Sequence, residues 1–113
     1  MTQTASLPRG ASYAAEVLRL YTLLPGTPDR PRPSDRRLAA ELERQGVPLD
    51  LIHAAFILGA ARRACSLRAL PAIRSLHYFL PILEEVQEQP PDPSYIELLD
   101  WRLRAAARSA SDE

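Results

Sequence analysis

Apolar residues recur at every third or fourth position along most of the chain, which is the spacing of one face of an α-helix. The first such segment follows Ser12, a good helix N-cap, and ends at Pro25-Gly26. Residues 25–33 contain four prolines, so we expect this connection to be stiff and extended. The inner face of the predicted first helix consists of Ala14, Val17, Leu18, Tyr21 and Leu24.

Two more helical segments follow, separated only by a tight turn. Ser34 is placed to cap the second helix, and Gly46 supplies the left-handed residue that ends it. The third helix has Pro48 in its first turn, where the missing N–H costs nothing. Between Leu51 and Ala61 it is apolar nearly all round, so we expect it in the centre of a bundle or in a subunit interface.

The last third of the chain predicts two helices that are separated by Gln89-Pro90-Pro91. Ser75 is the expected cap of the fourth helix, and Pro81 predicts either a kink or a short turn after which the helix restarts. Asp92 followed by Pro93 is a strong start signal for the fifth helix. No segment shows the alternating pattern of a β-strand.

These elements predict an all-α protein, a compact bundle of about five helices with the third helix at its centre. At 113 residues, of which 46% are hydrophobic, the chain can build one core and has little room for a second domain. We expect a flexible N-terminal tail over residues 1–11, a single helical domain over residues 12–108 and a frayed C-terminus over residues 109–113.

The composition indicates a cytoplasmic protein. Cys65 is the single cysteine, which leaves no internal disulfide and fits a reducing cytosol. The chain does not start like a signal peptide, and no apolar run approaches the roughly 20 residues that a membrane span needs, so we expect no membrane contact. All fourteen basic residues are arginine, which indicates a GC-rich bacterial genome or, alternatively, selection for bidentate phosphate contacts.

The sequence contains few candidate catalytic or metal-binding residues. The histidines are His53, which has only Asp50 as a polar neighbour one turn away, and His77. Glu84 and Glu85 are adjacent and point about 100° apart on a helix, so they do not chelate a metal jointly. The four glycines are scattered and form no phosphate-cradling loop. We therefore predict a protein that is not an enzyme and needs no metal or cofactor.

Charge is segregated along the chain although the formal net charge is zero. Residues 1–83 carry eleven arginines against six acids, whereas residues 84–100 carry six acids and no arginine. Arginines gather at the start of the second helix, where outward N–H groups favour anions, and around the end of the third. The candidate phosphate contacts are Arg30, Arg32, Arg36, Arg37, Arg62 and Arg63.

Two alternatives to phosphate binding stay open for these arginines. The first cluster, together with Asp29 and Asp35, is equally typical of a solvated loop. The second cluster, which also includes Arg68 and Arg74, has the opposite charge to residues 84–100 and would pair with them inside one molecule or between two.

The second and third helices also have features of a helix-turn-helix. Gly46-Val47-Pro48 followed by Ile52 matches the motif, whereas Leu42 stands where a small residue is usual. Reading bases requires long polar side chains on the outward face of the third helix, and the residues there are largely apolar. We therefore expect any contact with DNA to be made through phosphates, without base readout. The outward positions are Pro48, Leu49, Asp50, His53, Ala54 and Ile57.

Residues 13–89 resemble a known helical module. The shared features are a helix with Leu18 and Tyr21, the Leu51-Ile52 helix, and a segment over residues 73–83 with Tyr78 before the last helix. On these features the chain resembles the DnaD-like module at the C-terminus of bacterial and phage replication initiation proteins. It is also similar to short uncharacterised proteins carried near bacterial mobile elements. The resemblance implies non-catalytic binding of DNA and partner proteins, with DNA near Tyr78.

Two functions are compatible with these patterns. The first is a non-catalytic accessory protein in DNA transactions, such as replication or mobile-element maintenance, that contacts the phosphate backbone. The alternative is a protein–protein adaptor or obligate homo-oligomer, without nucleic acid, that uses the apolar third helix and an acidic face of the last two helices. The candidate partner contacts are Tyr78, Glu84, Glu85, Glu88 and Trp101.

Overall fold

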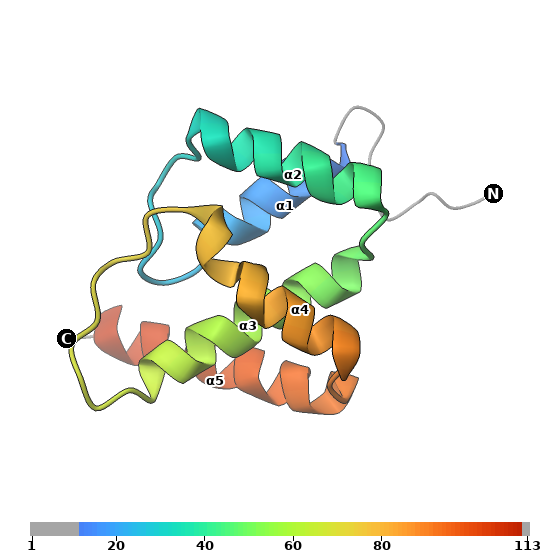
Figure 1. Ribbon diagram of the computed structural model, residues 1–113. Coiled ribbons are helices and arrows are strands. Elements are labelled where there is room, and N and C mark those ends of the chain that lie inside the picture. Colours follow the sequence, from blue (N-terminus) through green and yellow to red (C-terminus); the bar gives the residue numbers. More distant parts are fainter. Residues whose placement is uncertain (1–11, 112–113) are drawn as a thin grey trace.

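Capping groups and prolines set the helix boundaries in the computed structural model, which describes residues 12–111 (Figure 1). These residues form five α-helices, one 3₁₀ turn and no β-strand, which confirms the all-α prediction. In chain order the elements are α1 (Tyr13–Thr22), α2 (Pro33–Gln45), α3 (Leu49–Ala64), the 3₁₀ turn η1 (Leu76–Phe79), α4 (Leu80–Glu88) and α5 (Pro93–Ser111). The expected tail over residues 1–11 lies outside the described residues.

The predicted N-cap of α1 is confirmed, whereas that of α2 is wrong. The Ser12 hydroxyl accepts a hydrogen bond from the N–H of Ala15 (3.1 Å), as expected of an N-cap. The prediction that Ser34 caps α2 is wrong, because α2 begins at Pro33. Its cap comes from inside the first turn, where the Asp35 carboxylate accepts the N–H of Arg32 (2.9 Å).

The last two helices begin where prolines predict. Pro81 lies in the first turn of α4, and η1 precedes that helix, so the alternative of a short turn before a restarted helix is confirmed. α5 begins at Pro93. The Asp92 carboxylate accepts the N–H of Ser94 (2.8 Å), as the start signal predicts. The helix continues to Ser111, slightly beyond its expected end.

α3 lies in the middle of the bundle, as predicted. It packs against α1, η1, α4 and α5, while α2 packs against α1 and η1 (Figure 1). Tyr21, Phe56 and Phe79 from three of these elements form an aromatic cluster with ring centroids 4.9–6.4 Å apart. The chain's own helices therefore cover most of α3, and seven of its residues are buried. The buried residues of α3 are Ile52, Ala54, Ala55, Phe56, Ile57, Gly59 and Ala60.

α5 is attached on the side of α3 away from α2 (Figure 1). Ile96 and Leu99 of α5 pack on Ala54 and Ile57 of α3 in a small second core. In the stretch 12–111, no helix is both long and apolar enough to cross a membrane.

Candidate nucleic-acid interface

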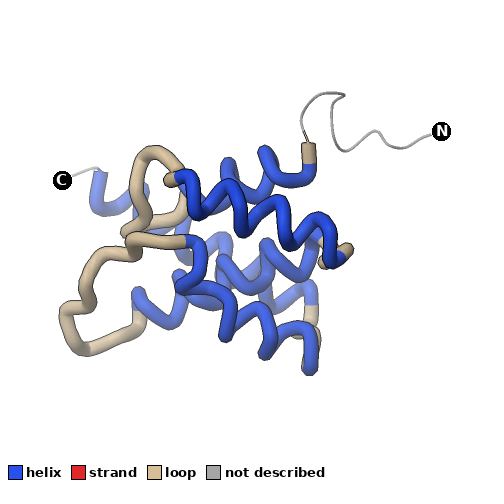
Figure 2. The backbone as a smooth tube through the Cα atoms, turned by 45° about the horizontal axis from the view of Figure 1, so that its top comes forward, coloured by secondary structure: helices blue, strands red, loops and turns tan. Residues whose placement is uncertain are grey.

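Two long loops, residues 23–32 and 65–75, lie together at one end of the helices (Figures 1 and 2). The N–H of Ile73 donates to the carbonyl of Gly26 (2.9 Å) and ties one loop to the other. Gly26 has φ +83°, a left-handed conformation that favours glycine. The Thr27 hydroxyl donates to the carbonyl of Leu24 (2.7 Å) and holds the same turn. Both loops are therefore held to each other and to α1.

A buried carboxylate joins the start of α2 to η1. Asp35 is fully buried, and its Oδ2 accepts the N–H of Arg32 while its Oδ1 accepts the N–H of Leu76, each at 2.9 Å. The Ser75 hydroxyl lies 3.5 Å from the same Oδ1. Backbone N–H donors thus compensate the burial of this charge, as a buried carboxylate requires. The hydrogen bonds fix residues 74–76 beside the first turn of α2.

This link brings arginines from both sequence clusters together. Arg74 directly precedes Ser75, so its backbone lies beside the start of α2, where the preceding loop and the helix together carry four arginines. All five side chains are exposed, and in the described part of the chain no carboxylate lies within ion-pair distance of any of them. We call this surface the basic end. It consists of Arg30, Arg32, Arg36, Arg37 and Arg74.

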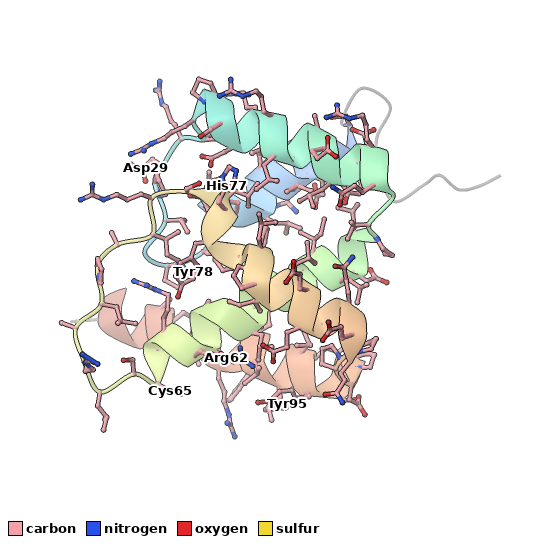
Figure 3. The ribbon with its side chains drawn as sticks, in the orientation of Figure 1. Asp29, Arg62, Cys65, His77, Tyr78 and Tyr95 are labelled. Carbon is pink, nitrogen blue, oxygen red and sulfur yellow. The ribbon has the colours of Figure 1, made fainter. Side chains whose placement is uncertain are left out.

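The exposed Asp29 and the buried Asp35 reduce the net positive charge of the basic end. Asp29 and His77 are exposed and lie at this end of the molecule (Figure 3). The helix N–H groups are mostly occupied, since Pro33 has none and the N–H groups of Asp35 and Arg36 donate to the Arg32 carbonyl. Attraction for an anion therefore comes from the guanidinium groups rather than from the helix terminus.

Arg62 is paired inside the molecule. Its guanidinium makes two hydrogen bonds to Glu85 of α4, at 2.9 and 2.5 Å (Arg62 in Figure 3). These hydrogen bonds lower the pKa of Glu85 and raise that of Arg62. The pairing of the second arginine cluster with the acidic segment, left open by the sequence, thus occurs for Arg62. Its charge is balanced and adds no net attraction for phosphate.

Arg63 also serves the fold. Its guanidinium donates to the carbonyl of Pro71 (2.7 Å) and lies 5.5 Å from the centre of the Tyr78 ring. This cation–π contact ties the end of α3 to η1 and to the second loop. Of the six candidate phosphate contacts, the four at α2 lie together, whereas Arg62 and Arg63 contact the chain itself.

The candidate partner contacts lie on three different elements. Tyr78 belongs to η1, and Glu84, Glu85 and Glu88 are exposed on α4. Trp101 is 61% exposed on α5. Two further exposed side chains of α5, Tyr95 and Leu98, were not among the candidates. The spacing of Ile96 and Leu99 places the inner face of α5 away from these two residues, and this signal could have identified them.

Ser75, His77 and Asp35 form a contact that resembles catalytic machinery. The Ser75 hydroxyl lies 2.8 Å from Nδ1 of His77 and 3.5 Å from Asp35. A serine hydrolase needs its carboxylate on the histidine, whereas here the carboxylate contacts the serine. The Ser75 oxygen also accepts the N–H of His77 (3.1 Å), which caps η1. We therefore assign the contact to the fold.

The described residues contain no candidate metal site, and the comparisons with known proteins found no match. Among residues 12–111, as far as their side chains are described, no three His, Cys, Asp or Glu side chains lie close enough together to hold a metal ion. Comparison with protein-family models, with curated proteins and with solved structures found no match. The resemblance to the DnaD-like module therefore stays a prediction.

Proposed function

We propose that this protein is a non-catalytic accessory factor that contacts the phosphate backbone of nucleic acid through the basic end. In this proposal it acts in the bacterial cytoplasm in replication or mobile-element maintenance. The supporting observation is the cluster of five exposed arginines without carboxylate partners, gathered by the hydrogen bonds of Asp35. Guanidinium groups form bidentate hydrogen bonds with phosphate oxygens, which suits this surface to a polyanion.

The arrangement of the helices favours binding without base readout. A recognition helix has to enter the major groove, but α3 is surrounded by α1, η1, α4 and α5. The basic end instead consists of the first turn of α2 and two loops, so its arginines are not carried on one exposed helix that can lie in the groove. Binding is therefore expected to be electrostatic, with the micromolar or weaker affinity typical of nonspecific contacts.

Fluorescence anisotropy with labelled single- and double-stranded oligonucleotides, over a series of salt concentrations, tests the proposal. If all five arginines contact phosphates, the log–log slope of affinity against salt is about −4 to −5 for duplex DNA. Replacing Arg36 and Arg37 with glutamine reduces that slope by about 2. Absence of binding at low salt contradicts the proposal.

A matched control removes the same charge elsewhere. Arg44 and Arg62 are both exposed, and each is paired with a carboxylate on the chain. The double variant Arg44→Gln, Arg62→Gln loses the same net charge as the variant at the basic end. We expect it to leave the salt slope unchanged, because these guanidinium groups are already neutralised. If both double variants weaken binding equally, net charge rather than the basic end determines the affinity.

A further inference from the structure

α5 has an apolar side that the bundle does not cover. Ile96 and Leu99 are buried against α3, whereas Leu98 and Trp101, which point away from them, are 42% and 61% exposed. Tyr95 is 50% exposed on the edge of this side (Figure 3). Three of the large hydrophobic side chains that are exposed in the described residues therefore belong to one helix. Grouped exposure of this kind marks a contact surface rather than ordinary scatter.

The spacing on this side of α5 is that of a coiled-coil seam. Ser94, Leu98, Trp101 and Ala105 follow one another at intervals of four, three and four residues. This repeat places them in a line along the helix, as at the a and d positions of a heptad. Glu97 and Arg104 flank the seam on one edge, and Tyr95 and Arg102 flank it on the other. We call Ser94, Leu98, Trp101 and Ala105 the α5 seam.

The charges of α5 identify the occupant of this seam. The N-terminal half of the helix and its cap carry only acids, and the following residues through 108 carry only arginines. Such a helix is complementary to an antiparallel copy of itself, and a two-fold axis produces that arrangement. The acids are Asp92, Glu97 and Asp100, and the arginines are Arg102, Arg104 and Arg108.

We propose that two copies of this chain associate through antiparallel α5 helices. In this dimer Leu98 packs against the partner's Trp101, and Ser94 lies opposite the partner's Ala105. Glu97 then faces the partner's Arg104. Arg104 also makes two hydrogen bonds to Asp100 of its own chain, each 3.1 Å long, so we expect its contact with Glu97 to set the register rather than to supply most of the affinity. The interface needs no rearrangement of the bundle, because Ser94, Leu98 and Trp101 are exposed and Ala105 is partly exposed on the outer side of one helix.

The dimer is small and separate from the basic end. The α5 seam extends over residues 94–105, about 16 Å along the helix, which is short for an interface of standard size. We therefore expect an association that depends on protein concentration. Tyr95 lies on the side of the molecule away from Asp29 and His77 (Figure 3), so the dimer leaves both basic ends exposed. The proposal does not rest on nucleic-acid binding.

Sedimentation velocity from low micromolar to near-millimolar protein measures the association. The wild type shifts from monomer to dimer, and emission of Trp101, the single tryptophan, shifts to shorter wavelength as the indole leaves water. Leu98→Glu stays monomeric, and circular dichroism confirms that it folds. The control Leu67→Glu changes a fully exposed leucine in the second loop and leaves the dimer intact. A wild type that is monomeric throughout overturns the proposal.

Charge exchange tests the pairing across the two-fold axis. Glu97→Arg sets like charges opposite each other and weakens the dimer. Adding Arg104→Glu in the same chain restores an attractive pair and recovers association. If the double variant is as weak as the single one, Glu97 does not face Arg104 and the proposed register is wrong.

Disulfide trapping tests the antiparallel orientation, in a Cys65→Ser background that removes the one native thiol. In the proposed register Ser94→Cys lies next to Ala105→Cys of the other copy. Two copies of Ser94→Cys hold their thiols about 16 Å apart, beyond the Cα separation of a disulfide. A mixture of the two variants therefore crosslinks, whereas neither variant crosslinks alone. Efficient crosslinking of Ser94→Cys with itself indicates parallel helices and overturns the proposal.

Discussion

Replacing Asp35 with alanine tests whether this buried carboxylate holds the basic end together. The side chain accepts one backbone N–H from Arg32 and another from Leu76, which is itself 2% exposed. Alanine provides no acceptor for either donor. The Leu76 N–H is left buried without a partner, and water does not reach it without opening the contact between η1 and α2.

The cost of this substitution follows from the two lost hydrogen bonds. Each hydrogen bond to a charged group contributes about 1.5–3 kcal/mol, so the free energy of unfolding falls by about 3–6 kcal/mol. This is a large part of the 5–15 kcal/mol that is typical of a small domain, and it lowers Tm by about 12–25 °C. Asp35→Asn keeps the shape and one acceptor, so about half of the loss is expected.

Urea and thermal unfolding, followed by circular dichroism, measure these changes. The matched control is Asp29→Ala, because Asp29 is an exposed carboxylate in the adjoining loop and makes no hydrogen bond among the described residues. It is expected to change the free energy of unfolding by less than about 0.5 kcal/mol. The reasoning is refuted if Asp35→Ala unfolds within about 1 kcal/mol of the wild type, since two buried hydrogen bonds cost more than that.

Three further predictions concern the core. A Cβ atom at Gly59 would lie 2.8 Å from Cε1 of Phe79. Although alanine favours helix more than glycine does, we expect Gly59→Ala to lower the free energy of unfolding in urea by about 1–2 kcal/mol because of this clash. A variant that is more stable than the wild type contradicts this. The hydroxyl of Tyr21 is buried and has no hydrogen-bond partner among the described residues. We therefore expect Tyr21→Phe to leave the free energy of unfolding unchanged or to raise it by about 1 kcal/mol. A clear decrease in the free energy of unfolding contradicts this and indicates that the hydroxyl has a partner. Burial raises the pKa of Tyr13 and Tyr21 to about 12, from the usual value of 10.0. The folded state therefore favours the neutral phenols, so the free energy of unfolding is fully retained below pH 10 and falls as the pH rises through 12. Phenolate absorbance of the folded protein measures this ionisation. Ionisation of these two tyrosines near pH 10 contradicts the prediction.

Local sequence signals predicted most of the fold because they act within one helical turn. Pro81 and Asp92-Pro93 indicated helix starts, and Gly46 adopts the left-handed conformation (φ +73°) that ends α2. The cap of α2 was missed because Asp35 in the first turn, rather than Ser34, supplies the acceptor for the N–H of Arg32. Asp35 also makes a second contact, with the N–H of Leu76. The second contact joins residues 41 positions apart, which no local pattern reports.

The candidate site was only partly predictable for the same reason. The sequence indicated that arginines gather at the start of α2, and these side chains are exposed. Which arginine pairs with which acid depends on the packing of α3 on α4, which brings Arg62 to Glu85. Likewise, the apolar pattern of α3 fits both a bundle centre and a subunit interface. Only the packing of the other helices around it distinguishes the two.

NMR titration of the isotope-labelled protein with a short unlabelled oligonucleotide tests the central claim most directly, because it locates the contact residue by residue. The account predicts that amide shifts concentrate at residues 30–37 and 74–77, and that they diminish as salt is added. Resonances of α4 and α5 stay in place at constant protein concentration. Shifts that concentrate on those two helices, or a spectrum that does not change at low salt, would contradict the assignment of the basic end as a phosphate-binding surface.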